Sequence, residues 1–443
     1  MSDQALYSAH INHRRERLDH LLNAHGFDVL FIHSGRLSYP RFDDRAQPFR
    51  VHGHFNAWVP LPYTPDCLLE LRSGQRPVLW YLQPEDFWHA PPKAPEEWWA
   101  SQWDVQIIKD PADWVKRIER SEATAVIGEE AHLAGLGDHI AVNPRSLMQA
   151  LDEDRTFKTE YERACIYQAS LKGARAHRAA KAAFDEGQSE LGIFQAYLHA
   201  LNEDPMTLPY DGIVALNDHA SILHYQHRDI EGPKAHLSFL LDAGADHLGY
   251  ASDITRTHMG HAQTREGGMF QGLIDAMDHL ERGLAHSARA GHSFVDMHHQ
   301  AHQGIAQILS QTDLVSGSVE SIVTGGITRT FFPHGLGHFL GAQVHDVAGQ
   351  VDGQGHALPP PPDDPMLRLT RTLKEGNVVT IEPGLYFIPM LLGKLKGESA
   401  GQQVNWPAVE SLIPYGGIRI EDNVLVTEAE PVNYTREAFH AID

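Results

Sequence analysis

Hydrophobic positions in the first third of the chain follow helical spacing in some segments and strand spacing in others. Apolar side chains recur at helical intervals over residues 11–23, which predicts an amphipathic helix. The runs 28–33 and 77–82 are short and rich in β-branched and aromatic residues, as expected for buried strands. This alternation continues to about residue 150. It therefore predicts a small α/β domain over 1–155.

A polar segment at 152–160 separates this pattern from a long helix-forming run over 160–186. Thr159 stands three residues before Glu162, which is the spacing of a capping box at the start of a helix. Strands, helices and Gly- or Pro-containing loops alternate from there onward. A chain of 443 residues is too long for one small core, so we predict a second, larger domain over 156–443.

The charge and cysteine content narrow the classes of function. The formal net charge is -22, which disfavours a nucleic-acid partner and favours the binding of cations. No run approaches the roughly 18 apolar residues of a membrane helix, and the first twenty residues lack the apolar segment of a signal peptide. We therefore expect a cytoplasmic protein without a membrane partner. The two cysteines, Cys67 and Cys165, exclude a disulfide framework and a CxxC metal site.

The segment 238–257 has the pattern of a hairpin with an aspartate on each arm. An apolar run leads into a Gly-containing turn and returns through β-branched residues. If the turn is centred on His247 and Leu248, Asp242 and Asp253 face each other with Cβ atoms about 4.5–5.5 Å apart. Two carboxylates that close repel unless a proton or a cation lies between them. A cation site is the simpler interpretation; the alternative places one aspartate in the turn and the other in solvent.

Two histidines follow in a glycine-rich segment. His334 and His338 have the i,i+4 spacing of a helical zinc site, but Gly335 and Gly337 disfavour a helix. No Glu stands beside His334, so an HExxH protease is excluded. We expect a loop whose glycines let the backbone approach a ligand closely. Chance clustering remains an alternative, because the chain contains 30 histidines.

Two glutamates lie in strand-like segments near the C-terminus. Glu382 ends an apolar run just before a Pro-Gly turn. Strand alternation across 416–426 puts Arg419, Glu421 and Asn423 on one face. Taken singly, neither glutamate is remarkable, and a solvated strand explains each of them better than a metal site does.

As an ordered set, these residues resemble the metal ligands of the pita-bread metallopeptidases, which include methionine aminopeptidase, aminopeptidase P and prolidase. The set comprises Asp242, Asp253, His338, Glu382 and Glu421. The segments DAGA, PHGLGH, TIEPGLYF and GGIRIEDN are similar to the prolidase branch, the bacterial Xaa-Pro dipeptidases, which include the organophosphorus acid anhydrolases. The resemblance implies an α+β pita-bread (creatinase/aminopeptidase-like) catalytic domain. It also implies hydrolysis of the imide bond before a C-terminal proline.

The resemblance further implies two metal ions per chain. Asp253 and Glu421 would bridge them, Asp242 would complete one site, and His338 with Glu382 would complete the other. An oxygen-rich set of this kind suits Mn²⁺, or Co²⁺, better than the Cys/His set of structural zinc. A hydroxide held between the two ions would be the nucleophile, with Glu382 as the proton shuttle.

The same resemblance assigns the remaining site residues. His224 and His345 would hold the substrate and stabilise the tetrahedral intermediate. The substrate itself would be bound by Arg368, Arg419, His334, Tyr210 and Asp44. The two arginines would clamp the C-terminal carboxylate, with His334 as a third donor. Asp44 lies in a loop similar to one that family homodimers lend to the partner's active site. The chain departs from the family at Phe294, where many relatives carry Tyr, so a hydrogen bond would be missing there.

Three other functions stay open at this point. A phosphotriesterase would use the same metals on P–F and P–O bonds, either as a side activity or as the principal one. An aminopeptidase P would trim longer X-Pro peptides and would not need Arg368 to face a C-terminus. A metal-free binding module would have lost ligands, whereas this sequence retains all five.

Overall fold

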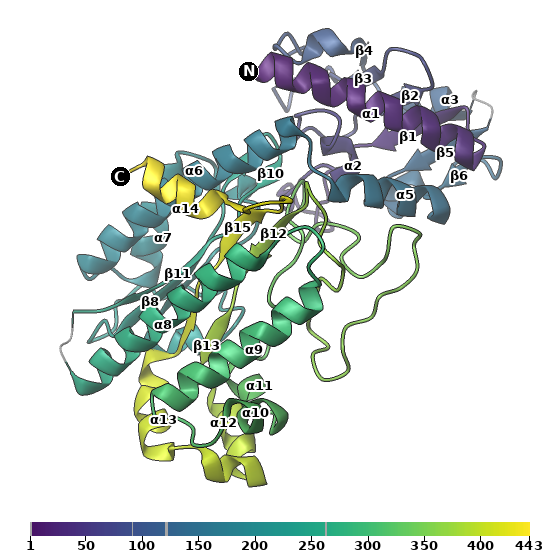
Figure 1. Ribbon diagram of the computed structural model, residues 1–443. Coiled ribbons are helices and arrows are strands. Elements are labelled where there is room, and N and C mark those ends of the chain that lie inside the picture. The colour runs from purple at the N-terminus through teal and green to yellow at the C-terminus, as the bar shows by residue number, and fades with distance from the viewer. Residues whose placement is uncertain (1, 91, 120–122, 262–263) are drawn as a thin grey trace. The chain divides into compact units, whose positions relative to one another are not determined.

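The computed structural model describes residues 2–90, 92–119, 123–261 and 264–443 (Figure 1). The chain forms two compact units. The first comprises Met1–Cys165, Leu248–Tyr250 and Gly353–His356, and the second comprises Ile166–His247, Ala251–Asp352 and Ala357–Asp443. None of the helices in the described ranges is long and apolar enough to cross a membrane.

The first unit is built on a mixed six-stranded sheet with the strand order β4-β3-β2-β1-β5-β6. Its strands are β1 (Val29–His33), β2 (Leu68–Arg72), β3 (Val78–Leu82), β4 (Asp104–Ile108), β5 (Thr124–Ile127) and β6 (Ala141–Val142). Its helices are α1 (Asp3–His25), α2 (Gly53–Asn56), α3 (Ala112–Glu119), α4 (Glu130–Leu133) and α5 (Arg145–Thr156). Strand β1 pairs antiparallel with β2 and parallel with β5. The α/β prediction is confirmed, and β1 and β3 fall within the two predicted strand runs.

The predicted domain boundary at 155/156 falls at the end of α5, and the next helix is α6 (Glu160–Asp185). The predicted capping box forms at the start of α6. The backbone N–H of Thr159 donates to Glu162 Oε2 at 2.9 Å, and the N–H of Glu162 donates back to Thr159 Oγ1 at 3.4 Å. These reciprocal bonds satisfy two amides that the first turn of a helix leaves unpaired.

The second unit contains several small antiparallel sheets. One has the order β11-β8-β7 and another the order β12-β15-β16, and β13 pairs with β14. The strands are β7 (Ile213–Leu216), β8 (Ser238–Asp242), β9 (Asp246–His247), β10 (Tyr250–Ala251), β11 (Thr255–Met259), β12 (Val378–Ile381), β13 (Gly384–Tyr386), β14 (Gly417–Arg419), β15 (Asp422–Leu425) and β16 (Val432–Asn433).

Helices pack over these sheets, and α8 and α9 run alongside each other (Figure 1). After α6 the helices are α7 (Glu190–Leu201), α8 (Arg265–Ser287), α9 (Phe294–Gln311), α10 (Val319–Thr324), α11 (Ile327–Phe331), α12 (Pro389–Lys396), α13 (Trp406–Leu412) and α14 (Tyr434–Ala441). The largest hydrophobic core joins α8 and α9 to β12 and β15. Phe294, the first residue of α9, is fully buried in that core. Its ring packs against apolar side chains, and the hydrogen bond expected to be missing at this position stays a prediction.

The aspartate-bearing hairpin forms, but its register differs from the predicted one. Strands β8 and β11 pair so that Asp242 stands opposite Thr255 rather than opposite Asp253. The turn lies at Leu248 and Gly249, which both have positive φ, at 54° and 85°. A tight two-residue turn with both φ values positive favours glycine in one of the two positions, so the turn moves one residue toward the C-terminus. That move shifts the pairing by two residues.

The segment predicted as one strand over 416–426 is two strands. β14 pairs with β13 and β15 pairs with β12, and the chain leaves both ladders at Glu421. The break has a physical cause: the Glu421 N–H donates to the carbonyl of Thr255 at 3.1 Å, which draws the backbone toward β11. The strand alternation inferred from the sequence is interrupted there.

Candidate metal centre and active site

A cavity of about 510 Å³ in the second unit gathers nearly all the predicted site residues. Its lining includes the five predicted metal ligands: Asp242, Asp253, His338, Glu382 and Glu421. It also includes the other predicted catalytic and substrate-binding side chains of this unit: Tyr210, His224, His334, His345, Arg368 and Arg419. The remaining predicted residue, Asp44, lies in an exposed segment of the first unit. Phe294 is not among the residues that line the cavity.

Asp242 and Asp253 converge on one hydroxyl despite the altered hairpin register. Asp242 ends β8, and Asp253 precedes β11, where its N–H donates to Asn423 Oδ1 at 3.2 Å. The hydroxyl of Tyr210 lies 2.9 Å from Asp242 Oδ1 and 2.6 Å from Asp253 Oδ1. One phenolic O–H can donate to only one of them at a time. The second carboxylate then needs a proton or a cation at that point.

His338 is fixed with one ring nitrogen directed at the carboxylates. It lies in the predicted non-helical loop after α11, and its Nδ1–H donates to the carbonyl of Phe339 at 2.9 Å. That bond leaves Nε2 facing Asp253 Oδ2 at 3.4 Å and Glu382 Oε1 at 3.9 Å, where it could bind a metal ion held by the same carboxylates. A Cβ on Gly337 would lie 2.1 Å from the carbonyl oxygen of Thr380, so this glycine lets the loop pack closely against β12, and the predicted close approach to a ligand stays a prediction.

The two glutamates are held by the ends of neighbouring strands. Glu382 follows β12, and its N–H donates to the carbonyl of Leu336 at 2.8 Å. Glu421 is buried, and its Oε2 accepts a hydrogen bond from Thr255 Oγ1 at 2.7 Å. Asp253, His338 and Glu421 each offer one ligand atom, and these three atoms lie within 4.8 Å of one another. Segments far apart in the sequence thus present donor atoms to one point.

The pKa values of the buried carboxylates indicate that the cavity favours a bound positive charge. Burial raises the pKa of Glu421 well above its usual value, and repulsion from the Asp253 carboxylate is the next largest cause. Burial likewise raises the pKa of Asp242, and it raises that of Glu382 to about 7. Burial also opposes ionisation of Asp253, but its contacts with His338 and Tyr210 outweigh that effect and lower its pKa.

The cavity lining therefore carries five carboxylates, those of the four predicted ligands and of Asp211, but only two guanidiniums, those of Arg368 and Arg419. Divalent cations bound among the carboxylate oxygens and the imidazole would compensate this charge. Mn²⁺ and similar ions prefer such oxygen-rich donor sets. The donor set in the structure fits the metals that the sequence predicted.

Arg419 and His334 are joined through a residue that the sequence did not single out, Tyr386. Arg419 Nη2 donates to Asp242 Oδ2 at 2.6 Å, and Nη1 donates to the Tyr386 hydroxyl at 2.8 Å. His334 Nδ1–H donates to the carbonyl of Gly335 at 2.8 Å, so its Nε2 accepts from the Tyr386 hydroxyl at 2.9 Å. Burial lowers the pKa of His334 to about 3, which keeps the ring neutral.

Both ring nitrogens of His334 are engaged within the protein, one with Gly335 and the other with Tyr386. The role of His334 as a third donor to the substrate stays a prediction. Two nitrogens of the Arg419 guanidinium donate to Asp242 and Tyr386. Arg419 therefore orients Asp242, one of the predicted metal ligands. The signal for Tyr386 was present in the segment TIEPGLYF, because Glu382, Gly384 and Tyr386 alternate at the two-residue period of a strand.

Three of the predicted residues in the cavity, His224, His345 and Arg368, remain available to a substrate. His224 and Arg368 are exposed, and Arg368 forms no ion pair with any residue in the described part of the chain. The ring of His345 stands edge-on to that of His338, with centroids 4.4 Å apart. Desolvation lowers the pKa of His345 to about 4, so it is neutral at pH 7 and able to donate through one nitrogen.

Comparisons with known proteins agree with this picture along the whole chain. Residues 5–152 match a model described as the N-terminal domain of Xaa-Pro dipeptidase, and residues 164–428 match metallopeptidase family M24. The Xaa-Pro dipeptidase of Xanthomonas campestris pv. campestris (strain 8004) is 44% identical over 98% of each chain. That of Stenotrophomonas maltophilia (strain K279a) is 42% identical over 99% of this chain and 98% of its own.

Solved structures share the fold at lower identity. Zinc-substituted aminopeptidase P of E. coli, in complex with product, has a TM-score of 0.74 and 21% identity over 99% of this chain and 96% of its own. Proline aminopeptidase P II of Yersinia pestis has the same TM-score and identity over 99% and 97%. These matches confirm the predicted fold, an α/β N-terminal domain with a pita-bread catalytic domain.

Proposed function

Given that the chain belongs to metallopeptidase family M24, and is therefore a hydrolase, we propose that it is a dinuclear-metal Xaa-Pro dipeptidase. The observation that carries the proposal is the convergence of four carboxylates and one imidazole in a cavity that also contains an unpaired arginine, Arg368. The curated relatives that match over the full chain are named Xaa-Pro dipeptidases, which supports the same substrate class.

Five side chains would hold the two ions, which we propose to be Mn²⁺, with Co²⁺ as a substitute. Asp253 and Glu421 would be shared by both ions, Asp242 would complete one site, and His338 with Glu382 would complete the other. Oxygen-rich ligation and a single imidazole support this choice of metal. When bound, the ions would supply an activated water as nucleophile and stabilise negative charge in the transition state.

The chain's own residues then handle protons and the substrate. The Glu382 carboxylate has partial access to the cavity, so it can accept a proton from the attacking water and pass it to the leaving imide nitrogen. His224 and His345 line the same cavity and would hold the scissile carbonyl. Because His345 is neutral, it can donate a hydrogen bond to the developing oxyanion without first losing a proton.

Arg368 would read the free C-terminal carboxylate and so restrict the enzyme to dipeptides. Its exposed guanidinium lies in the cavity, and planar guanidinium geometry matches a carboxylate. The test compares Ala-Pro with its C-terminal amide and with Ala-Pro-Ala. The proposal predicts that Ala-Pro is cleaved fastest and that Arg368→Ala removes the preference. Faster cleavage of Ala-Pro-Ala would instead indicate the aminopeptidase P activity for which the structural neighbours are named.

Hydrolysis of P–F and P–O bonds is proposed as a side activity. A tetrahedral phosphorus ester can use the same nucleophile, and it carries no carboxylate for Arg368 to bind. Arg368→Ala should therefore depress kcat/KM for Ala-Pro by about 10–150-fold, as expected for a charged hydrogen bond, and leave phosphotriester hydrolysis nearly unchanged. Loss of both activities in equal proportion would show that Arg368 has a structural role.

A homodimer is the proposed assembly, with Asp44 near a subunit interface. The segment around Asp44 exposes two large aromatic side chains, Tyr39 and Phe42, and Phe42 is 93% exposed. Exposed apolar groups of this kind mark interaction surfaces. Sedimentation of the wild type and of Phe42→Ser tests the assembly, since a monomeric wild type would contradict it.

A further inference from the structure

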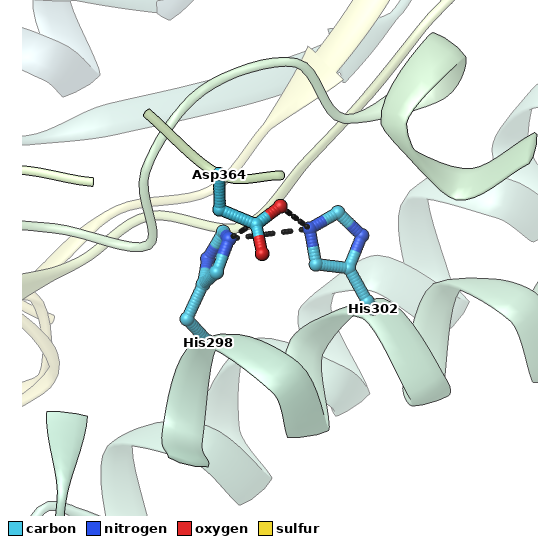
Figure 2. A group of neighbouring side chains, drawn as sticks. All are labelled: His298, His302 and Asp364. Carbon is cyan, nitrogen blue, oxygen red and sulfur yellow. Dashed lines mark hydrogen bonds and ion pairs between the residues drawn. The ribbon is translucent and has the colours of Figure 1, made fainter. Parts of the chain in front are cut away.

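A second cluster of metal-ligating side chains lies in the catalytic unit and shares no residue with the dinuclear centre. His298 and His302 stand one turn apart on α9, and Asp364 comes from the loop that follows the proline run 359–362. All three side chains are buried, and their polar atoms turn toward one another (Figure 2). Neither the sequence analysis nor the proposed reaction uses them.

The distances within this cluster fit a cation better than a set of hydrogen bonds. The two Nε2 atoms are 3.2 Å apart, and Asp364 Oδ1 is 3.6 Å from each of them. Charge-assisted hydrogen bonds are about 2.7–2.9 Å long, so both contacts of Asp364 with the rings are longer than a direct hydrogen bond. Ligand atoms about 2.0–2.1 Å from a tetrahedral zinc ion are separated by roughly 3.3–3.4 Å, which is close to all three distances. A shared proton would account for only the contact between the rings.

The hydrogen bonding around the rings of His298 and His302 is also compatible with metal binding through Nε2. His302 Nδ1 is 3.0 Å from Thr328 Oγ1, so a proton on Nδ1 leaves the Nε2 lone pair facing the centre. The Nδ1 of His298 has no hydrogen-bond partner among the described residues, so this buried ring makes its polar contacts through Nε2.

Arg329 keeps the Asp364 carboxylate ionised and fixes its orientation. Arg329 Nε donates to Asp364 Oδ1 at 2.7 Å, and its Nη2 donates to Oδ2 at 3.0 Å. Hydrogen bonds of this kind to a ligating carboxylate are common in metal sites. A cavity of about 120 Å³ borders His298 and Asp364 and leaves room for water as a further ligand.

We propose that His298, His302 and Asp364 bind one divalent transition-metal ion, of which Zn²⁺ fits best, with water in the fourth position. Two imidazoles and one carboxylate form a common zinc ligand set. The ion would connect α9 to the loop that carries Arg368, four residues beyond Asp364. An effect on substrate binding would follow only if Arg368 has the role proposed above, whereas the metal site does not depend on that role.

The test counts zinc in full-length protein saturated with Zn²⁺ and then freed of loose metal by gel filtration. The wild type should contain one ion more than His298→Gln and His302→Gln, whose affinity at this site should fall at least about 100-fold. The matched control is His299→Gln, since His299 lies on the same helix with a half-exposed side chain 3.7 Å from the other oxygen of Asp364. It should keep the wild-type count.

A second variant separates this site from the dinuclear centre. Asp253→Ala should empty the dinuclear centre and retain one zinc ion, and Co²⁺ in that protein should give the intense visible absorption of a tetrahedral site. Adding His302→Gln should abolish both signals. Equal zinc content in the wild type and both glutamine variants would overturn the proposal. So would an Asp253→Ala protein without zinc, a result that decides the matter even if the glutamine variants fail to fold.

Discussion

Chelating the metal leaves the buried carboxylates without a compensating cation. Their contribution to the free energy of unfolding should then fall as the pH rises. Burial raises the pKa of Glu382 from an ordinary value of 4.5 to about 7. Between those pH values the unfolded chain releases this proton while the metal-free folded protein keeps it, so folding becomes less favourable. At about 1.4 kcal/mol per pH unit, Glu382 alone should remove about 3 kcal/mol of stability by pH 7.

The neighbouring carboxylates change the size of this loss but not its sign. The pKa values of Asp242 and Glu421 are also raised by burial, so both add to the loss. Asp253 has a lowered pKa, and the stability it contributes is lost only at pH values below its ordinary 3.8, outside this window. Bound cations would hold all four carboxylates ionised in the folded state and remove the pH dependence.

The assay is urea denaturation of the chelated protein at several pH values between 4.5 and 7.5. Glu382→Gln cannot ionise, so it should gain about 3 kcal/mol relative to the wild type between pH 4.5 and 7. The control Glu398→Gln, at an exposed glutamate, should follow the wild type. Identical pH slopes for the wild type and Glu382→Gln would refute the reasoning.

Three further predictions follow from the hydrogen bonds and ligands described. Tyr386→Phe removes the hydroxyl that Arg419 and His334 share, and the free energy of unfolding should fall by about 1.5–3 kcal/mol in chemical denaturation, since a charged donor loses its partner. Asp253→Ala should lower metal content at both positions of the dinuclear centre, whereas Asp242→Ala should weaken chiefly one; equal, wild-type metal content in both variants would contradict the assignment. Thr159→Ala removes one half of the capping box and should cost about 0.5–2 kcal/mol of stability without changing kcat on Ala-Pro.

Local signals in the sequence predicted much of the fold. The capping box at Thr159, the helices α1 and α6, and the glycine-rich loop around His338 depend on residues close in sequence. The ordered motifs also identified five side chains that one cavity brings together. The local features were predictable because spacing along the chain is enough to specify them, whereas the five-residue set was inferred from the resemblance to a known family.

Other features depend on pairings that spacing does not specify. The hairpin register follows from the positive φ values at Leu248 and Gly249, and the break at Glu421 follows from its bond to Thr255 in a distant strand. The role of Tyr386 became apparent only when β13 and β14 placed it beside Arg419. In each case the local sequence is compatible with several conformations, and a tertiary contact determines which of them forms.

The most direct test of the central claim is the rate of Ala-Pro hydrolysis as Mn²⁺ is added back to the chelated protein. The measurement uses His302→Gln, so that the second metal site proposed here does not contribute to the count. We predict no hydrolysis without metal and activity that rises with bound Mn²⁺ and levels off at two ions per chain. Full activity in metal-free protein, or no Ala-Pro hydrolysis at saturating Mn²⁺ or Co²⁺, would contradict the assignment of a dinuclear Xaa-Pro dipeptidase.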